Sequence, residues 1–182
     1  MLLADGPDPY SLEKREVVFA AAEGEGNFKE ATLYQAPDRS WRLFFEFARD
    51  GASRIGMARA AEIGTRWTQM DEMVPIREDG WDNWHLSPGP IILVPGRDPV
   101  MFYNGATSDA RWRIGWVSFD RDCGRITDRG VEPLLVPPPA SDRAATDIAF
   151  AASAIVQEDQ TVHLYYSLED RKLARAVVRA YD

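Results

Sequence analysis

A cluster of aromatic and polar side chains lies in the segment DGWDNWHLSPGP, residues 79–90. Two indoles, Trp81 and Trp84, flank the carboxylate of Asp82, and the imidazole of His85 follows directly. Indole faces pack against the apolar C–H face of a pyranose, while carboxylates accept hydroxyl hydrogen bonds or act as acid and base. The cluster therefore favours a carbohydrate site. The alternative is that the tryptophans pack between sheets and that His85 is a structural histidine.

A second chemical candidate is Glu30, which opens the otherwise apolar strand EATLY. An unpaired carboxylate buried in such a strand would be costly, so a role in a site explains it better. Glycoside hydrolysis usually needs two carboxylates on opposite sides of the scissile bond. Asp147 is the second carboxylate that we consider, and Asp170 lies in the hairpin turn of YYSLED.

Composition and motifs exclude several other classes of function. The net charge of −8 disfavours nucleic acid, because an acidic surface repels phosphates. Two histidines and the single Cys123 provide no metal-ligand spacing, and no dinucleotide or Walker motif is present, so we expect no cofactor and no metal. The N-terminus resembles neither a signal peptide nor a membrane span, so we expect no membrane contact and a cytoplasmic protein.

The elements that position these residues are predicted by an internal repeat. Three segments each contain an apolar-aromatic strand, a polar turn and a second strand, and Phe44, Phe102 and Tyr165 align at intervals of about 60 residues. Another apolar strand precedes each segment, and a more polar one follows the first two. The three segments are residues 41–60, 99–119 and 162–178.

Four antiparallel strands repeated in this way indicate an all-β fold of the β-propeller type, with an irregular β-sandwich as the alternative. We expect a single propeller domain over 1–182, with the end of a blade at 1–25 and blades at 26–78, 79–136 and 137–182. Propellers typically close with at least about four blades. The chain is therefore expected to be partial, and it needs either missing N-terminal blades or a second copy, as a homodimer.

Blade topology predicts which residues meet. The start of the first strand and the turn between the second and third strands of every blade share one rim. Glu30, Asp147, Asp170 and the Trp81–His85 cluster are expected there. Asn104 and Arg113 flank the corresponding turn of the middle blade.

Four segments together resemble a known family. The segments GWDNWHLSPGPIILVPGRDPVMFYNGA, RIGWVSFD, VEPLLVPPP and DIAFAASAIVQEDQTVHLYYSLEDRKLARAVV are similar to the C-terminal half of glycoside hydrolase family 130. This family contains mannoside phosphorylases and related β-mannosidases. The resemblance implies a five-bladed propeller, of which this chain would supply about three blades and a leading partial one.

The resemblance also implies roles for individual residues. Glu30 stands where the family keeps its proton-donor aspartate, and Asp170 where an aspartate contacts the sugar. The phosphorylases carry a phosphate-binding histidine in YHG, but this chain has YNG with Asn104; Glu46 stands where an arginine is expected. These departures favour hydrolysis over phosphorolysis of β-mannosides or related oligosaccharides.

The resulting hypothesis is a glycoside hydrolase-like protein whose partner is an oligosaccharide or glycoside. The alternatives are a non-catalytic carbohydrate-binding or assembly propeller and an inactive fragment of a larger glycosidase. The catalytic candidates are Glu30 and Asp147. The substrate-binding candidates are Trp81, Asp82, Trp84, His85, Asn104, Arg113 and Asp170.

Overall fold

The chain consists of antiparallel β-strands joined by turns. The computed structural model describes residues 1–17, 19–21, 26–70, 72–138 and 148–180, and these residues contain no helix. The predicted all-β class is therefore confirmed. Among the described residues, no helix has the length and apolar character needed to cross a membrane.

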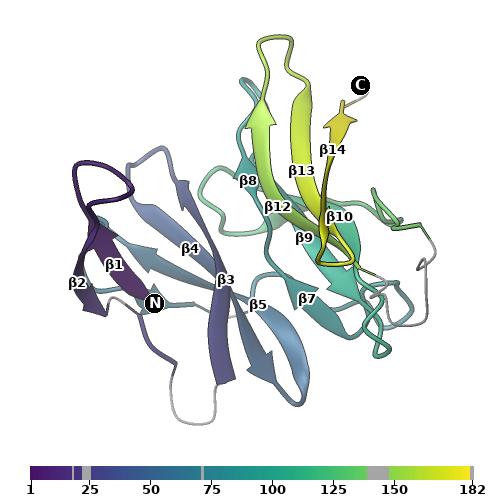
Figure 1. Cartoon of the computed structure of the whole chain (residues 1–182), viewed down its shortest axis with the longest axis horizontal. Helices are drawn as coiled ribbons and strands as arrows, with labels where there is room; N and C mark the ends of the chain where they lie inside the picture. The colour runs from purple at the N-terminus through teal and green to yellow at the C-terminus, as the bar shows by residue number, and fades with distance from the viewer. Residues whose placement is uncertain (18, 22–25, 71, 139–147, 181–182) are drawn as a thin grey trace.

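The strands form an N-terminal hairpin and three larger sheets (Figure 1). The hairpin pairs β1 (Leu2–Asp5) with β2 (Glu13–Val17). The first sheet has the order β3 (Gly26–Gln35), β4 (Trp41–Arg49), β5 (Ala52–Ala60), β6 (Thr68–Gln69). The second contains β7 (His85–Ser87), β8 (Ile91–Ile92), β9 (Val100–Ala106), β10 (Arg113–Phe119) and β11 (Ile126–Arg129). The third contains β12 (Ala149–Val156), β13 (Val162–Leu168) and β14 (Lys172–Val178).

The sheet order follows the chain order, as expected for a repeated meander. In the second sheet, the innermost strand is interrupted at Pro88–Pro90, so β7 and β8 pair separately with β9. The third sheet differs from the prediction of four strands, since its described residues form only three. The predicted blade ranges 26–78, 79–136 and 137–182 each contain one sheet, and 1–25 contains the hairpin.

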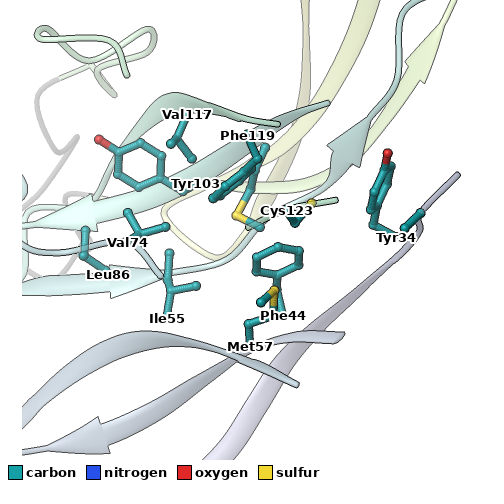
Figure 2. Packing of buried hydrophobic residues seen from close by; sticks show 12 residues of the cluster. Tyr34, Phe44, Ile55, Met57, Val74, Leu86, Tyr103, Val117, Phe119 and Cys123 are labelled. Carbon is teal, nitrogen blue, oxygen red and sulfur yellow. The ribbon is translucent and has the colours of Figure 1, made fainter. Parts of the chain in front are cut away.

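The aligned apolar positions of the repeat form the contacts between successive sheets. Phe44 and Ile55 of the first sheet pack in one cluster with Leu86, Tyr103 and Phe119 of the second (Figure 2). This burial removes large apolar side chains from water, which is the main favourable contribution to folding.

The next contact repeats the same pattern one sheet later. Phe102 and Ile114, the equivalents of Phe44 and Ile55, lie in a cluster with Ala151, Val162 and Leu164 of the third sheet. A further cluster joins the other face of the first sheet to residues near the hairpin, including Phe19. The molecule is thus a series of sheets, with the hairpin at one end and the third sheet at the other (Figure 1).

Cys123 lies buried in the cluster between the first two sheets. Burial raises the pKa of its thiol to about 12, which keeps the sulfur protonated at neutral pH. The residue is therefore a packing group.

Candidate functional site

A cavity of about 410 Å³ lies where the innermost strands of the three sheets approach one another. Ligand pockets commonly have volumes from roughly 300 to 1,000 Å³. The walls come from β3, from the Pro88–Ile91 segment and from β12, with one residue of β13. The lining side chains with polar groups are Glu30, Thr32, Ser153 and Ser167, and Phe150 is the aromatic one.

The Pro-Gly-Pro turn forms one wall because its backbone approaches β9 closely. A β-carbon on Gly89 would lie only 2.0 Å from the carbonyl oxygen of Phe102. Glycine is therefore required at this position. The backbone N–H of Phe102 donates to the carbonyl of Pro90 at 3.0 Å, so the turn stays attached to β9 between β7 and β8 while it forms a wall of the cavity.

Glu30 adopts an unusual backbone conformation in the cavity wall. Its φ angle is +51°, and it lies inside a register shift of the β3–β4 ladder, between the Lys29–Glu46 pair and the Thr32–Phe44 pair. A non-glycine residue in this region costs on the order of 1–3 kcal/mol, and such residues cluster at functional sites. The side chain is exposed and borders the cavity.

A polar network lies beside Glu30. The carboxylate of Glu46 is buried, and it accepts a hydrogen bond from Ser53 Oγ at 2.7 Å and an ion pair from Lys29 Nζ at 3.2 Å. The backbone N–H of Ser53 donates to His85 Nδ1 at 3.1 Å, which joins the first sheet to the second. Burial lowers the pKa of His85, against the opposing effect of Glu46, so the ring is neutral at pH 7.

An aromatic row leads from this network to the cavity. Trp84 meets His85 edge-on at 6.5 Å, His85 stacks on Trp112 at 5.5 Å, and Trp112 meets Phe150 edge-on at 5.3 Å between ring centroids. Phe150 borders the cavity, whereas Trp84 is exposed at the other end. Sequence reasoning missed Trp112 and Phe150, although both positions fall near the predicted rim.

Asp82 belongs to a different environment from the one predicted. The residue is 0% exposed. Its carboxylate accepts hydrogen bonds from Arg77 Nε and Nη2 at 3.0 and 2.9 Å, from Tyr103 Oη at 2.6 Å, and from Arg129 Nη2. Burial raises the pKa of Tyr103 above its ordinary value, so this hydroxyl stays a donor. Asp82 therefore has no exposed atom to offer a ligand, and its contacts are those of a structural ion-pair centre.

Trp81 covers this ion-pair centre. Its ring stacks on Tyr103 at 5.6 Å, and its Nε1 donates to the carbonyl of Val131 at 3.1 Å. A β-carbon on Gly105 or Gly115 would lie within 2.8 Å of the indole, so both glycines admit the ring against the sheet. These contacts match the packing alternative for Trp81.

Asn104 links two walls of the cavity and is itself fully buried. Its Oδ1 accepts the backbone N–H of Ala151 at 2.7 Å, and its Nδ2 donates to the carbonyl of Pro88 at 3.4 Å. The amide thus joins β12 to the Pro-Gly-Pro turn. It shapes the cavity without being part of its lining.

The remaining predicted residues lie outside the cavity lining or outside the described part of the chain. Arg113 is half-buried, and its Nη1 donates to the carbonyl of Trp112 at 3.0 Å. Asp170 is exposed in the β13–β14 turn with a φ of +48°. Asp147 lies outside the described residues. Of the predicted site residues that the structure describes, Glu30 is thus the one whose side chain borders the cavity.

The chemistry of the cavity lining suits a neutral polar ligand. Its described lining contains one carboxylate, hydroxyl groups and an aromatic ring, with no lysine, arginine or histidine. These groups can accept and donate hydrogen bonds to sugar hydroxyls and pack against a pyranose face. Among the described residues, no group of three or more His, Cys, Asp or Glu side chains is arranged to hold a metal ion.

A larger hollow of about 1080 Å³ lies between the second and third sheets, near the turns at Arg97 and Gln160. Apolar side chains such as Phe102 and Trp116 line much of it. None of the predicted site residues that the structure describes borders this hollow, whereas Glu30 borders the smaller cavity.

Comparison with known proteins identifies a relative in sequence and several in fold. No protein-family profile matches the sequence. The chain is 28% identical over 105 residues to the β-1,2-mannobiose phosphorylase of Listeria innocua, which covers 56% of this chain and 29% of the relative.

Solved structures share the fold over nearly the whole chain. The Listeria innocua β-1,2-mannobiose phosphorylase, in complex with β-1,2-mannobiose, has a TM-score of 0.82 and 21% identity over 98% of this chain and 50% of that one. A putative glycosidase from Bacteroides thetaiotaomicron has a TM-score of 0.71 and 19% identity, covering 96% and 58%. The mannose phosphorylase MPT-4 of Leishmania mexicana has a TM-score of 0.65 and 14% identity, covering 93% and 55%.

The chain spans about half the length of these structures. Another structural match, with a TM-score of 0.68, is described as a glycoside hydrolase from the family 130 of mannoside phosphorylases. In both sequence and fold, the chain is therefore similar to part of the mannoside phosphorylases of glycoside hydrolase family 130, as its motifs predict.

Proposed function

We propose that this protein acts on β-mannosides or related oligosaccharides as a glycoside hydrolase-like enzyme, with Glu30 as its proton donor. The observation that carries the proposal is the placement of Glu30, a strained residue at the wall of a cavity with hydroxyl groups and an aromatic ring. The similarity to proteins that are named for β-1,2-mannobiose supports the choice of substrate class.

In this proposal, Glu30 donates its proton to the oxygen of the scissile glycosidic bond. A water molecule attacks the sugar from the other side, and a second carboxylate accepts its proton. Asp147 is our candidate for that carboxylate. Lys29, the residue before Glu30 in the chain, forms its ion pair with Glu46 at 3.2 Å.

The described cavity lining favours hydrolysis over phosphorolysis. A phosphate dianion beside Glu30 needs a cation to offset the repulsion between like charges. The described lining offers no such cation, and the amide of Asn104 is already hydrogen-bonded to Ala151 and Pro88. We therefore propose that water is the acceptor in this protein, although the curated relative is a phosphorylase.

A non-catalytic carbohydrate-binding protein is the second candidate. Glu30 is the single carboxylate in the described lining, and glycoside hydrolysis usually requires two. A binding protein needs only the hydroxyl groups, the aromatic ring and one acceptor.

Product analysis with β-1,2-mannobiose separates these possibilities. The protein is incubated with the disaccharide in the presence and absence of inorganic phosphate, while calorimetry measures binding. We expect free mannose to form at the same rate with and without phosphate. Mannose 1-phosphate that forms only with phosphate would refute hydrolysis, binding without products would favour the second candidate, and no binding would refute both.

A further inference from the structure

The outer face of the third sheet exposes side chains at positions that are buried in the two preceding sheets. This outer face is formed by Ile155, His163, Tyr165, Leu173, Arg175 and Val177, which the strand register places on one side of β12, β13 and β14. Ile155, Leu173 and Val177 are 51%, 76% and 53% exposed.

The repeat indicates what such a face normally contacts. Leu173 is the equivalent of Ile55 and Ile114, both of which are 0% exposed because the next sheet packs on them. Tyr165 is the equivalent of the buried Phe102. The outer face therefore has the apolar pattern of a surface that another β-structure covers.

The strand at the edge of this face is basic, in a chain with a net charge of −8. Lys172 and Arg175 of β14 are exposed, as is Arg179 beyond its end. Among the described strands, β14 pairs with β13 alone, so its other edge has backbone groups available for association.

The opposite end of the molecule has the complementary character. In the N-terminal hairpin, the exposed charged residues whose side chains are described are Asp5, Asp8, Glu13 and Lys14, so this end is acidic on balance. Tyr10, Leu12 and Val17 are also exposed, at 98%, 56% and 58%. The hairpin and the third sheet lie at opposite ends of the series of sheets (Figure 1). One end thus presents acidic and apolar groups, and the other presents basic and apolar groups.

We propose that the outer face of the third sheet binds the N-terminal hairpin of a second copy of this chain. Two copies related by a two-fold axis can make this contact twice, because each copy has one surface of each kind. Self-pairing of two outer faces is disfavoured, since both surfaces carry the cationic side chain of Arg175. The outer face continues into the cavity wall at Ser153 and Ser167, so the second copy would lie beside the cavity.

Light scattering after size-exclusion chromatography tests this proposal on the 182-residue chain. We expect a mass twice the 20.5 kDa of one chain. Arg175→Glu and Glu13→Lys should each raise the dissociation constant at least about tenfold, because like charges then face each other. Arg175→Glu combined with Glu13→Lys in one chain should restore the dimer, since opposite charges meet again.

Matched controls are Arg66→Glu and Glu62→Lys, which make the same charge changes at exposed positions outside both surfaces. They should leave the dissociation constant unchanged. Circular dichroism and thermal unfolding check that each variant folds. A chain that is monomeric at all concentrations would overturn the proposal. The proposal would also be overturned if either single substitution left the dissociation constant unchanged, or if the double variant did not restore it.

Discussion

Glu30 and Asp82 are two carboxylates in contrasting surroundings. Asp82 is fully buried and accepts hydrogen bonds from two arginines and a tyrosine, whereas Glu30 is exposed at a cavity whose described lining contains no cation. The backbone of Glu30 is strained, while Asp82 is not among the residues with a positive φ angle. The contrast shows that a carboxylate paired on all sides contributes to stability, and one that is left open can contribute chemistry.

Removing the charge of Asp82 should have the largest effect on stability. The Asp82→Asn variant leaves the guanidinium groups of Arg77 and Arg129 without their shared counter-ion. Breaking a buried ion pair in this way costs about 3–5 kcal/mol. Urea unfolding followed by tryptophan fluorescence measures this loss.

The matched control is Asp79→Asn, at an exposed position in the same segment. It should change the free energy of unfolding by less than about 0.5 kcal/mol, as is usual for surface substitutions. Equal stability of the Asp82 and Asp79 variants would contradict the structural role of Asp82.

Replacing Glu30 with glycine should raise the free energy of unfolding, whereas Asp82→Asn lowers it. Glycine adopts a φ of +51° without a steric penalty, so Glu30→Gly should stabilise the fold by up to about 1 kcal/mol. Ala31→Gly, at the next position of the same strand, should instead destabilise it by about 0.5–1 kcal/mol. Two chemical-denaturation curves compare the variants, and a destabilised Glu30→Gly protein would remove the argument from strain.

The smallest expected effect is the pH dependence that His85 confers. Its pKa in the folded chain is lowered from 6.5, mainly by burial, so folding favours the neutral ring. The neutral ring contributes its full stability above pH 6.5, and this contribution is lost as the pH falls below 6.5 through the folded-state pKa. His85→Gln should flatten the stability curve in this range, measured by thermal unfolding at several pH values, and an unchanged slope would refute the assignment.

The apolar repeat was predictable from the sequence, whereas the environment of each carboxylate was not. Phe44 recurs as Phe102, and Ile55 recurs as Ile114, at intervals of about 60 residues, because successive sheets must bury equivalent positions. The partners of Asp82 could not be read in the same way, since Arg129 is 47 positions away and reaches it only through the fold.

In the candidate site too, the residue types could be predicted from the sequence, but the contacts between distant parts of the chain could not. Glu30 could be predicted, because a carboxylate in an apolar strand requires an explanation. Its left-handed backbone lies within a register shift between Lys29 and Thr32, which no local residue pattern indicates. Phe150 belongs to the cavity because Asn104 holds the start of β12 against the Pro-Gly-Pro turn, which is a contact between distant parts of the chain.

The central claim is that Glu30 is the acid of a glycoside-cleaving site, and the turnover of β-1,2-mannobiose by Glu30→Gln tests it most directly. Glutamine preserves the shape of the side chain and removes the proton, so turnover should fall by roughly a hundredfold or more, the usual contribution of a general acid. Calorimetry should show nearly unchanged binding of the disaccharide, and Glu62→Gln should keep full activity. A Glu30→Gln protein that turns over the disaccharide as fast as the parent would contradict the account.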